Sequence, residues 1–175
     1  MLKREKIIEL LEQLNVGLAK RNEIGEVGIV GGAAMCVVYN ARASTKDVDA
    51  IFKPTKIIRE IVSQIGAEQN LESDWLNDAA KGYIEGQFDR VEVLNRPNLR
   101  VWSPEPRYML AMKCLSSRWD SLDRQDVEFL VNLLQIKSPK EVFKIIESYF
   151  PKNRIPPKTQ FFIEELMQRP RKARK

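Results

Sequence analysis

The sequence predicts an α/β protein of the α+β type, with a small mixed β-sheet flanked by helices and a helical C-terminal part. Three observations support this prediction. Strand-like segments alternate with amphipathic segments in the first hundred residues, a turn joins two later strand-like segments, and the chain then has helical periodicity to its end. The 175 residues fit one domain that can bury a core of its own.

The first half of the chain is predicted from its apolar spacing. Leucines and isoleucines at helical spacing predict a first helix. Two short buried strands follow, the first ending in Gly31 and Gly32, with an apolar helix between them. Thr55 is the expected N-cap of the next helix. In order, these elements are residues 2–20, 26–32, 33–40, 47–52 and 55–67.

In the second half of the chain, turn and helix-start residues mark the boundaries of the predicted elements. A short helix is expected over 74–83, and residues 95–98 form the turn between strands 88–94 and 98–102. Ser103-Pro104 is predicted to open a helix, with proline at its first position. Ser121 or Asp123 is a candidate cap for the second of these C-terminal helices. Ser138 and Glu141 spell a capping box for the third, and Pro156-Pro157 precedes the last.

The expected organisation is a core of residues 1–103, a helical part of residues 104–168 packed on it in the same domain, and a disordered basic tail of residues 169–175. Residues 150–175 carry eight Lys or Arg and two Glu, a net charge of +6, so the rest carries −1 of the total +5. A basic end on a near-neutral body favours a polyanionic partner such as RNA, although such tails are often only solvated ends.

Several classes are excluded or disfavoured by composition. Histidine is absent, which removes Ser-His and Cys-His nucleophile pairs and histidine-ligated metals. Cys36 and Cys114 have neither disulfide-framework nor metal-type spacing. The N-terminus is an amphipathic pattern containing acids, unlike a secretory signal, and the longest uncharged stretch, 27–41, is too short for a membrane span. We therefore expect a cytoplasmic protein without membrane contact.

The segment "ASTKDVDAIF" places two aspartates in an apolar strand. Asp47 and Asp49 would share one face, about 7 Å apart. Two like charges in such a strand need a compensating cation, and Mg²⁺ would supply it. The alternative is a solvent-exposed pair, or one paired with Arg42, Lys46 or Lys53.

The glycines upstream strengthen the interpretation as a metal–nucleotide site. Gly31 and Gly32 end a strand and open a helix, where phosphate can approach the main chain closely. A dinucleotide-binding fold is the competing interpretation, but these glycines lack G-x-G-x-x-G spacing, and the acids are doubled within the strand. A Walker loop is excluded because no G-K-[ST] follows.

Together these residues resemble a known family. Strand-Gly-Gly-helix followed by Arg-x-Ser-Thr-x-Asp-x-Asp is similar to the polymerase-beta-like nucleotidyltransferases, and in particular to the small proteins related to abortive-infection and toxin-antitoxin systems. The segment "LRVWSPEPRYMLAMKCLSSRWDSLDRQDVEFLVNLL" extends the resemblance to about Leu134. The resemblance implies a nucleotidyltransferase fold and a Mg²⁺- or Mn²⁺-dependent transfer from an NTP.

The resemblance also implies roles for individual residues. Asp47 and Asp49 would ligate the metal, with Glu92 (or Asp89) as the expected third carboxylate. Lys113 would approach phosphates or base; the alternative is a lysine that snorkels from a helix. The expected catalytic group is Asp47, Asp49, Glu92 and Lys113, and the nucleotide-binding group is Gly31, Gly32, Arg42, Ser44, Thr45, Arg118, Asp123 and Asp126.

Three functions remain open at this point. The first is an enzyme that moves a nucleoside monophosphate to a hydroxyl of an RNA such as tRNA, or of a protein. The second is a catalytically weak antitoxin or regulatory protein that binds a cognate toxin or antitoxin. The third is a nucleic-acid-binding protein whose acid pair is structural.

Overall fold

The computed structural model describes residues 1–116 and 121–168, and the chain forms two compact units. Unit 1 comprises Met1–Ile84 and Asp89–Pro104, and unit 2 comprises Glu85–Phe88 and the chain from Glu105 onward. Arg118 and the tail 169–175 lie outside the described residues. The prediction that the helical part packs on the core as one domain stays a prediction.

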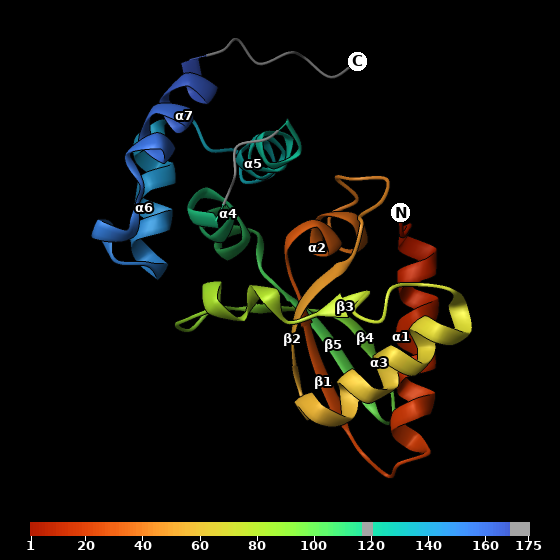
Figure 1. Cartoon of the computed structure of the whole chain (residues 1–175). Helices are drawn as coiled ribbons and strands as arrows, with labels where there is room; N and C mark the ends of the chain where they lie inside the picture. Colours follow the sequence, from red (N-terminus) through yellow and green to blue (C-terminus); the bar gives the residue numbers. More distant parts are fainter. Residues whose placement is uncertain (117–120, 169–175) are drawn as a thin grey trace. The chain divides into compact units, whose positions relative to one another are not determined.

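Unit 1 is built on the expected mixed sheet (Figure 1). The strand order is β3-β2-β1-β5-β4, with β1 antiparallel to β2, parallel to β5, and β4 antiparallel to β5. The strands are β1 (Gly25–Ile29), β2 (Val48–Lys53), β3 (Leu76–Asn77), β4 (Arg90–Asn95) and β5 (Leu99–Pro104), and the helices are α1 (Arg4–Ala19), α2 (Gly31–Val37), α3 (Thr55–Gln69) and a short 3-10 helix (Ala79–Tyr83).

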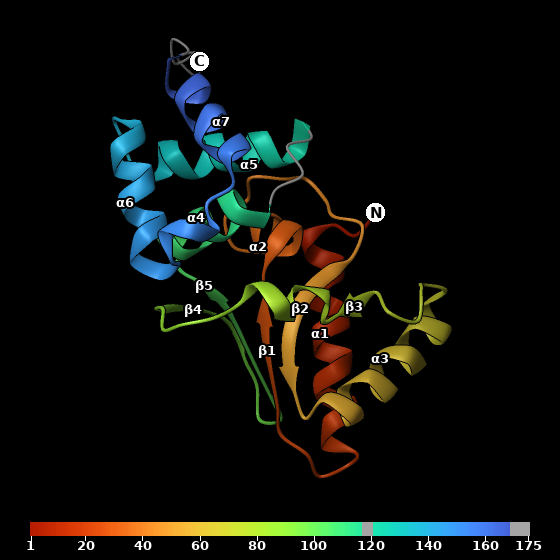
Figure 2. The same ribbon diagram turned by 60° about the vertical axis from the view of Figure 1, so that its left-hand side comes forward.

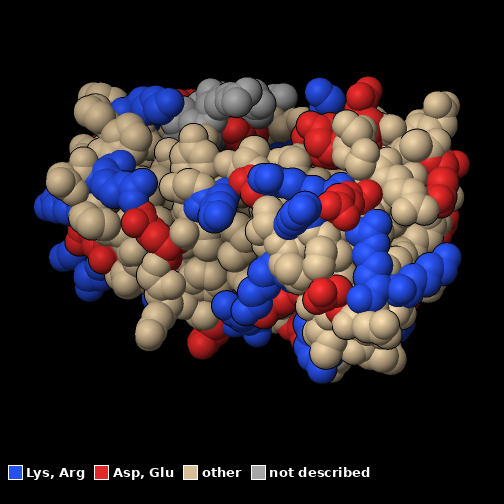
Figure 3. All heavy atoms as spheres, turned by 60° about the horizontal axis from the view of Figure 1, so that its bottom comes forward, with Lys and Arg blue, Asp and Glu red and all other residues tan. Residues whose placement is uncertain are grey.

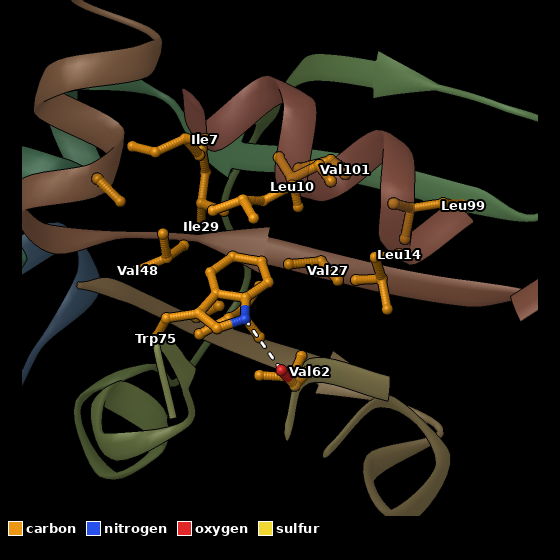
Figure 4. Packing of buried hydrophobic residues seen from close by; sticks show 14 of the residues in the cluster. Ile7, Leu10, Leu14, Val27, Ile29, Val48, Val62, Trp75, Leu99 and Val101 are labelled. Atoms are coloured by element: carbon orange, nitrogen blue, oxygen red, sulfur yellow. Dashed lines mark hydrogen bonds between the residues drawn. The ribbon is translucent and has the colours of Figure 1, made fainter. Parts of the chain in front are cut away.

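One face of this sheet forms the hydrophobic core with α1 and α3 (Figures 1 and 2). Val27 pairs with Phe52 on one side and Val101 on the other, so these side chains share this face. Trp75 closes the cluster and donates its Nε1–H to the carbonyl of Val62 in α3 at 3.0 Å (Figure 4). The opposite face therefore carries the alternate residues of each strand, including Asp49.

Three local predictions in unit 1 are wrong. The N-cap of α3 is Pro54, and the hydroxyl of Thr55 donates to the carbonyl of Phe52 at 3.1 Å. Residues 74–83 do not form one helix, because Leu76–Asn77 pairs with β2 as a short parallel strand before the 3-10 helix begins. Pro104 is the last residue of β5, opposite Arg90, and does not open a helix.

Unit 2 is helical, with α4 (Pro106–Ser116), α5 (Ser121–Leu133), α6 (Pro139–Tyr149), a short 3-10 helix (Lys152–Arg154) and α7 (Pro157–Gln168). Helix α4 begins at Pro106 because the carboxylate of Glu105 accepts hydrogen bonds from the N–H groups of Arg107 and Tyr108. The prediction of Ser138 as the N-cap of α6 is confirmed, because its hydroxyl accepts from the Glu141 N–H. The Glu141 carboxylate bonds back to the Ser138 hydroxyl and to the backbone N–H of Lys137.

Candidate functional site

The aspartate pair lies at the N-terminal end of β2. Asp49 is the second residue of the strand and is partly exposed, whereas Asp47 lies at a bend one residue before the strand begins. The prediction that both aspartates lie within the strand and share one of its faces is therefore wrong for Asp47, because the strand begins only at Val48. The strand is held at this point by the Val48 N–H, which donates to the Trp75 carbonyl at 2.7 Å.

Gly31 brings its backbone against the Asp49 carboxylate. Its φ of +58° lies in the left-handed region, and a Cβ added there would lie 3.0 Å from the Asp49 Oδ2 atom. The Val30 N–H donates to the Asp49 carbonyl at 2.9 Å, which fixes the approach of the two segments. A side chain at position 31 would be strained and would displace the carboxylate, so glycine is required here.

Gly32 meets the loop that precedes β2. A Cβ at position 32 would lie 2.8 Å from the Thr45 Oγ1 atom and 3.3 Å from an Arg42 guanidinium nitrogen. Thr45 is buried, and its backbone is paired with Leu2 in both directions, at 2.7 and 2.9 Å. The structure thus brings together Gly31, Gly32, Arg42, Thr45 and Asp49, with the partly exposed Ser44 and Asp47 next to them in sequence.

The predicted third carboxylate, Glu92, does not belong to this group. The sheet register pairs Glu92 with Trp102, Trp102 with Gly28, and Gly28 with Ile51, so Glu92 lies on the same face as Asp49. However, β1 and β5 separate their strands, and three interstrand spacings amount to about 14 Å. Two side chains so far apart cannot ligate the same ion. The prediction that Glu92 is the third metal ligand beside Asp49 is therefore wrong.

A second charged group on this face was not predicted. Glu26 on β1 accepts hydrogen bonds from Trp102 Nε1 and an Arg90 Nη, both at 2.7 Å, and pairs with Lys53 at 3.0 Å. Burial raises the pKa of the Glu26 carboxyl, but hydrogen bonds from Lys53 and Trp102 and the charges of Lys53 and Arg90 outweigh it, so the pKa lies below its ordinary value of 4.5.

Gly28 was the sequence signal that could have revealed this group. A glycine inside a strand often marks a close approach, and a Cβ there would lie 2.4 Å from the Trp102 ring. Glu26, Lys53, Arg90 and Trp102 line a hollow of about 720 Å³. Its lining does not include Asp49 or the glycine pair, so it is separate from the predicted site.

Asn77 is a second neighbour that sequence reasoning missed. It pairs with Asp49 across β2 and β3 and so lies on the same face of the sheet. Its side-chain oxygen accepts a hydrogen bond from the Ala79 N–H at 3.0 Å. The weak periodicity of residues 68–87 gave no indication of a strand there.

In unit 2, three predicted residues form one buried cluster. Lys113 near the end of α4 lies 3.1 Å from Asp123 and 2.8 Å from Asp126, both on α5. Asp126 is 1% exposed and Lys113 6% exposed. Asp123 lies in the first turn of α5, one helical turn before Asp126, so the two carboxylates share one face of the helix. Contact of this cluster with a nucleotide stays a prediction.

The residues at the N-terminal end of β2 fit a Mg²⁺ ion that is bound together with a nucleotide. Within 1–116 and 121–168, the structure holds no cluster of three or more Cys, Asp or Glu side chains suited to a metal. Mg²⁺ commonly takes only one or two carboxylates, with waters and substrate phosphates as its other ligands. Asp49 and Asp47 supply that number, beside glycines that leave room for phosphate.

Comparison with known protein families identifies the family of the chain. A family model described as "Nucleotidyltransferase of unknown function (DUF6036)" matches residues 5–142, which is most of the chain. The chain belongs to this nucleotidyltransferase family. The matched range includes the aspartate pair and the Lys113 cluster, and the family implies an NTP substrate. No curated protein and no solved structure matches the chain significantly.

Among the described residues, no helix is both long enough and apolar enough to cross a bilayer. On the face drawn in Figure 3, Lys and Arg side chains are interspersed with Asp and Glu. The described residues on that face therefore do not form an extended patch of one sign.

Proposed function

We propose that this nucleotidyltransferase moves a nucleoside monophosphate from an NTP to a hydroxyl acceptor, either the end of an RNA such as tRNA or a protein side chain. The observation that carries the proposal is the position of Asp49, whose carboxylate lies against the backbone of Gly31. A carboxylate and a bare backbone at one point suit a metal-bound phosphate.

Each residue of the site then has a task. Gly31 and Gly32 admit the phosphates to the main chain, while Arg42 and Thr45, both next to Gly32, contact phosphate oxygens. Asp49 and Asp47 hold the divalent cation. Bound Mg²⁺ or Mn²⁺ would supply charge neutralisation for the reacting phosphate and the departing pyrophosphate. The transfer forms a bond between the acceptor oxygen and the α-phosphorus and breaks the bond to the β-phosphate oxygen.

The test uses nucleotides labelled at the α- or the γ-phosphate, each incubated with Mg²⁺ or Mn²⁺, with and without total RNA. We expect incorporation from the α-label only. Asp49→Asn should reduce it by at least about 100-fold, because asparagine would hold the cation poorly and the charge of the reacting phosphates would no longer be neutralised. Glu92→Gln, on the same face of the sheet, is the matched control and should retain activity. Incorporation that survives both Asp47→Asn and Asp49→Asn would refute the proposal.

A second candidate is a protein that binds metal and nucleotide but transfers slowly, as an antitoxin or regulatory partner would. The observation that favours it is the distance of Glu92 from the aspartate pair, which leaves the site with two carboxylates from the described residues. NTP binding without incorporation, together with capture of a partner protein that persists in EDTA, would support this candidate. A toxin-antitoxin or phage-defence setting stays a prediction from the resemblance.

A further inference from the structure

Strand β4 forms one edge of the sheet. In the described part of the chain it pairs only with β5, so its other side has no strand beside it. Arg90 and Glu92 are exposed, and Val91 between them is partly exposed. Such an edge offers a row of backbone N–H and C=O groups to another chain.

The charges on β4 are self-complementary. In an antiparallel pair of identical strands related by a two-fold axis, one residue faces its own copy. If that residue is Val91, Arg90 of each chain faces Glu92 of the other. If it is Arg90 or Glu92, two like charges face each other directly, which destabilises the pair.

The surroundings of these two charges permit the additional contacts. The Arg90 guanidinium lies 4.0 Å from the centre of the Trp102 ring and bonds Glu26, yet about half of its side chain remains exposed. Glu92 accepts a hydrogen bond from the Asn95 side chain at 3.1 Å on the surface. The register of β4 against β5 shifts between Glu92 and Leu94, so the regular stretch is the part that holds Arg90, Val91 and Glu92.

We propose that β4 pairs with β4 of a second copy of this chain, antiparallel and centred on Val91, to join two sheets into one. Two short strands bury little surface, so association is weak and depends on concentration. The proposal is independent of nucleotide transfer, because β4 contributes no residue to the proposed site.

Cysteine cross-linking tests the register. Residues that face each other in an antiparallel pair have Cα atoms about 4.5–5.5 Å apart, a separation that a disulfide spans. Val91→Cys should form a disulfide-linked dimer under mild oxidation, whereas Asn95→Cys, an exposed position about 26 Å from its own copy in this register, should not. The native Cys36 and Cys114 are buried. Equal cross-linking of the two variants would overturn the proposal.

Sedimentation of the full chain over a concentration series tests the charges. Glu92→Arg should weaken self-association roughly tenfold, because Arg90 then faces an arginine twice per dimer. An equimolar mixture of Glu92→Arg and Arg90→Glu chains should associate as wild type does, since opposite charges face each other again. If Arg90→Glu fails to fold, the cross-linking result decides alone. A chain that stays monomeric at about 100 μM, with no Val91→Cys dimer, contradicts the proposal.

Discussion

Asp49 in unit 1 and Asp126 in unit 2 are both aspartates of the predicted site, but their surroundings differ. Asp49 is partly exposed and touches a glycine backbone, whereas Asp126 is 1% exposed and pairs with Lys113 at 2.8 Å. A carboxylate that binds a cation brought with the substrate must keep access to it. A carboxylate that is already paired with a buried lysine contributes mainly to the stability of its unit. Mutations should therefore separate the two residues by the property they change.

The largest expected effect is on the stability of unit 2. Lys113→Met leaves Asp123 and Asp126 without this cation in a buried setting and should lower the free energy of unfolding by about 3–5 kcal/mol. Asp49→Asn should lower it by less than Lys113→Met does, because the Asp49 side chain is partly exposed and asparagine has nearly the same size. Urea unfolding of both variants measures this difference, and similar losses in the two would remove the distinction.

The second effect concerns the packing on the face of the sheet that carries Asp49. Gly28→Ala should destabilise the protein by about 1–3 kcal/mol, because its Cβ would lie 2.4 Å from the Trp102 ring. Gly82→Ala is the control, since a Cβ there meets no atom within 4 Å. Thermal unfolding compares the two, and an unchanged midpoint for Gly28→Ala would show that Trp102 moves away freely.

The third effect concerns Gly31 and Gly32, which lie beside Asp49 and Thr45. Gly31→Ala should cost about 1–2 kcal/mol of stability, because its φ of +58° is strained for alanine. Gly32→Ala should also destabilise the protein, because its Cβ would lie 2.8 Å from the Oγ1 atom of the buried Thr45. Both variants should weaken NTP binding when it is measured by calorimetry. Tight binding by Gly31→Ala would mean that phosphate does not approach this backbone.

The smallest expected effect is pH-dependent. The pKa of Glu26 is lower in the folded protein than its ordinary value of 4.5, so ionised Glu26 stabilises the fold above that pH and loses this effect as the pH falls through the folded pKa. Glu26→Gln should therefore cost no more than about 1 kcal/mol at pH 7, and this cost should shrink as the pH falls through the folded pKa of Glu26. Urea unfolding over a descending pH series checks the sign, and a cost that does not fall with pH would assign the effect to packing.

The sequence was sufficient to predict a mixed sheet and its first two strands, with a helix between them, because these depend on local patterns. Alternation and glycine spacing identify β1, α2 and β2 without knowledge of their neighbours. The position of Glu92 relative to Asp49 depends on the order of the strands in the sheet. Strands β1 and β5 lie between β2 and β4, and the alternation of apolar residues does not reveal this order. Asn77 was missed for a similar reason, because a two-residue strand exists only through its pairing with β2.

Helix starts show the same limit. Ser138 and Glu141 satisfy each other within four residues, so the sequence predicts that cap correctly. Ser103-Pro104 has a similar helix-start spelling, but its place in the sheet beside β4 takes precedence, and the next proline, Pro106, opens the helix. Local sequence allows either proline to begin a helix. The pairing of Pro104 with Arg90 in the sheet leaves Pro106 as the first residue of α4.

The central claim is that Asp49, and not Glu92, holds the metal that accompanies an NTP. Binding of Mn²⁺ in the presence of a non-hydrolysable NTP, followed by electron paramagnetic resonance, measures it directly. We predict that wild type and Glu92→Gln bind with the same affinity and that Asp49→Asn binds at least about tenfold more weakly. Undiminished binding by Asp49→Asn, or an equal loss in Glu92→Gln, would contradict the claim.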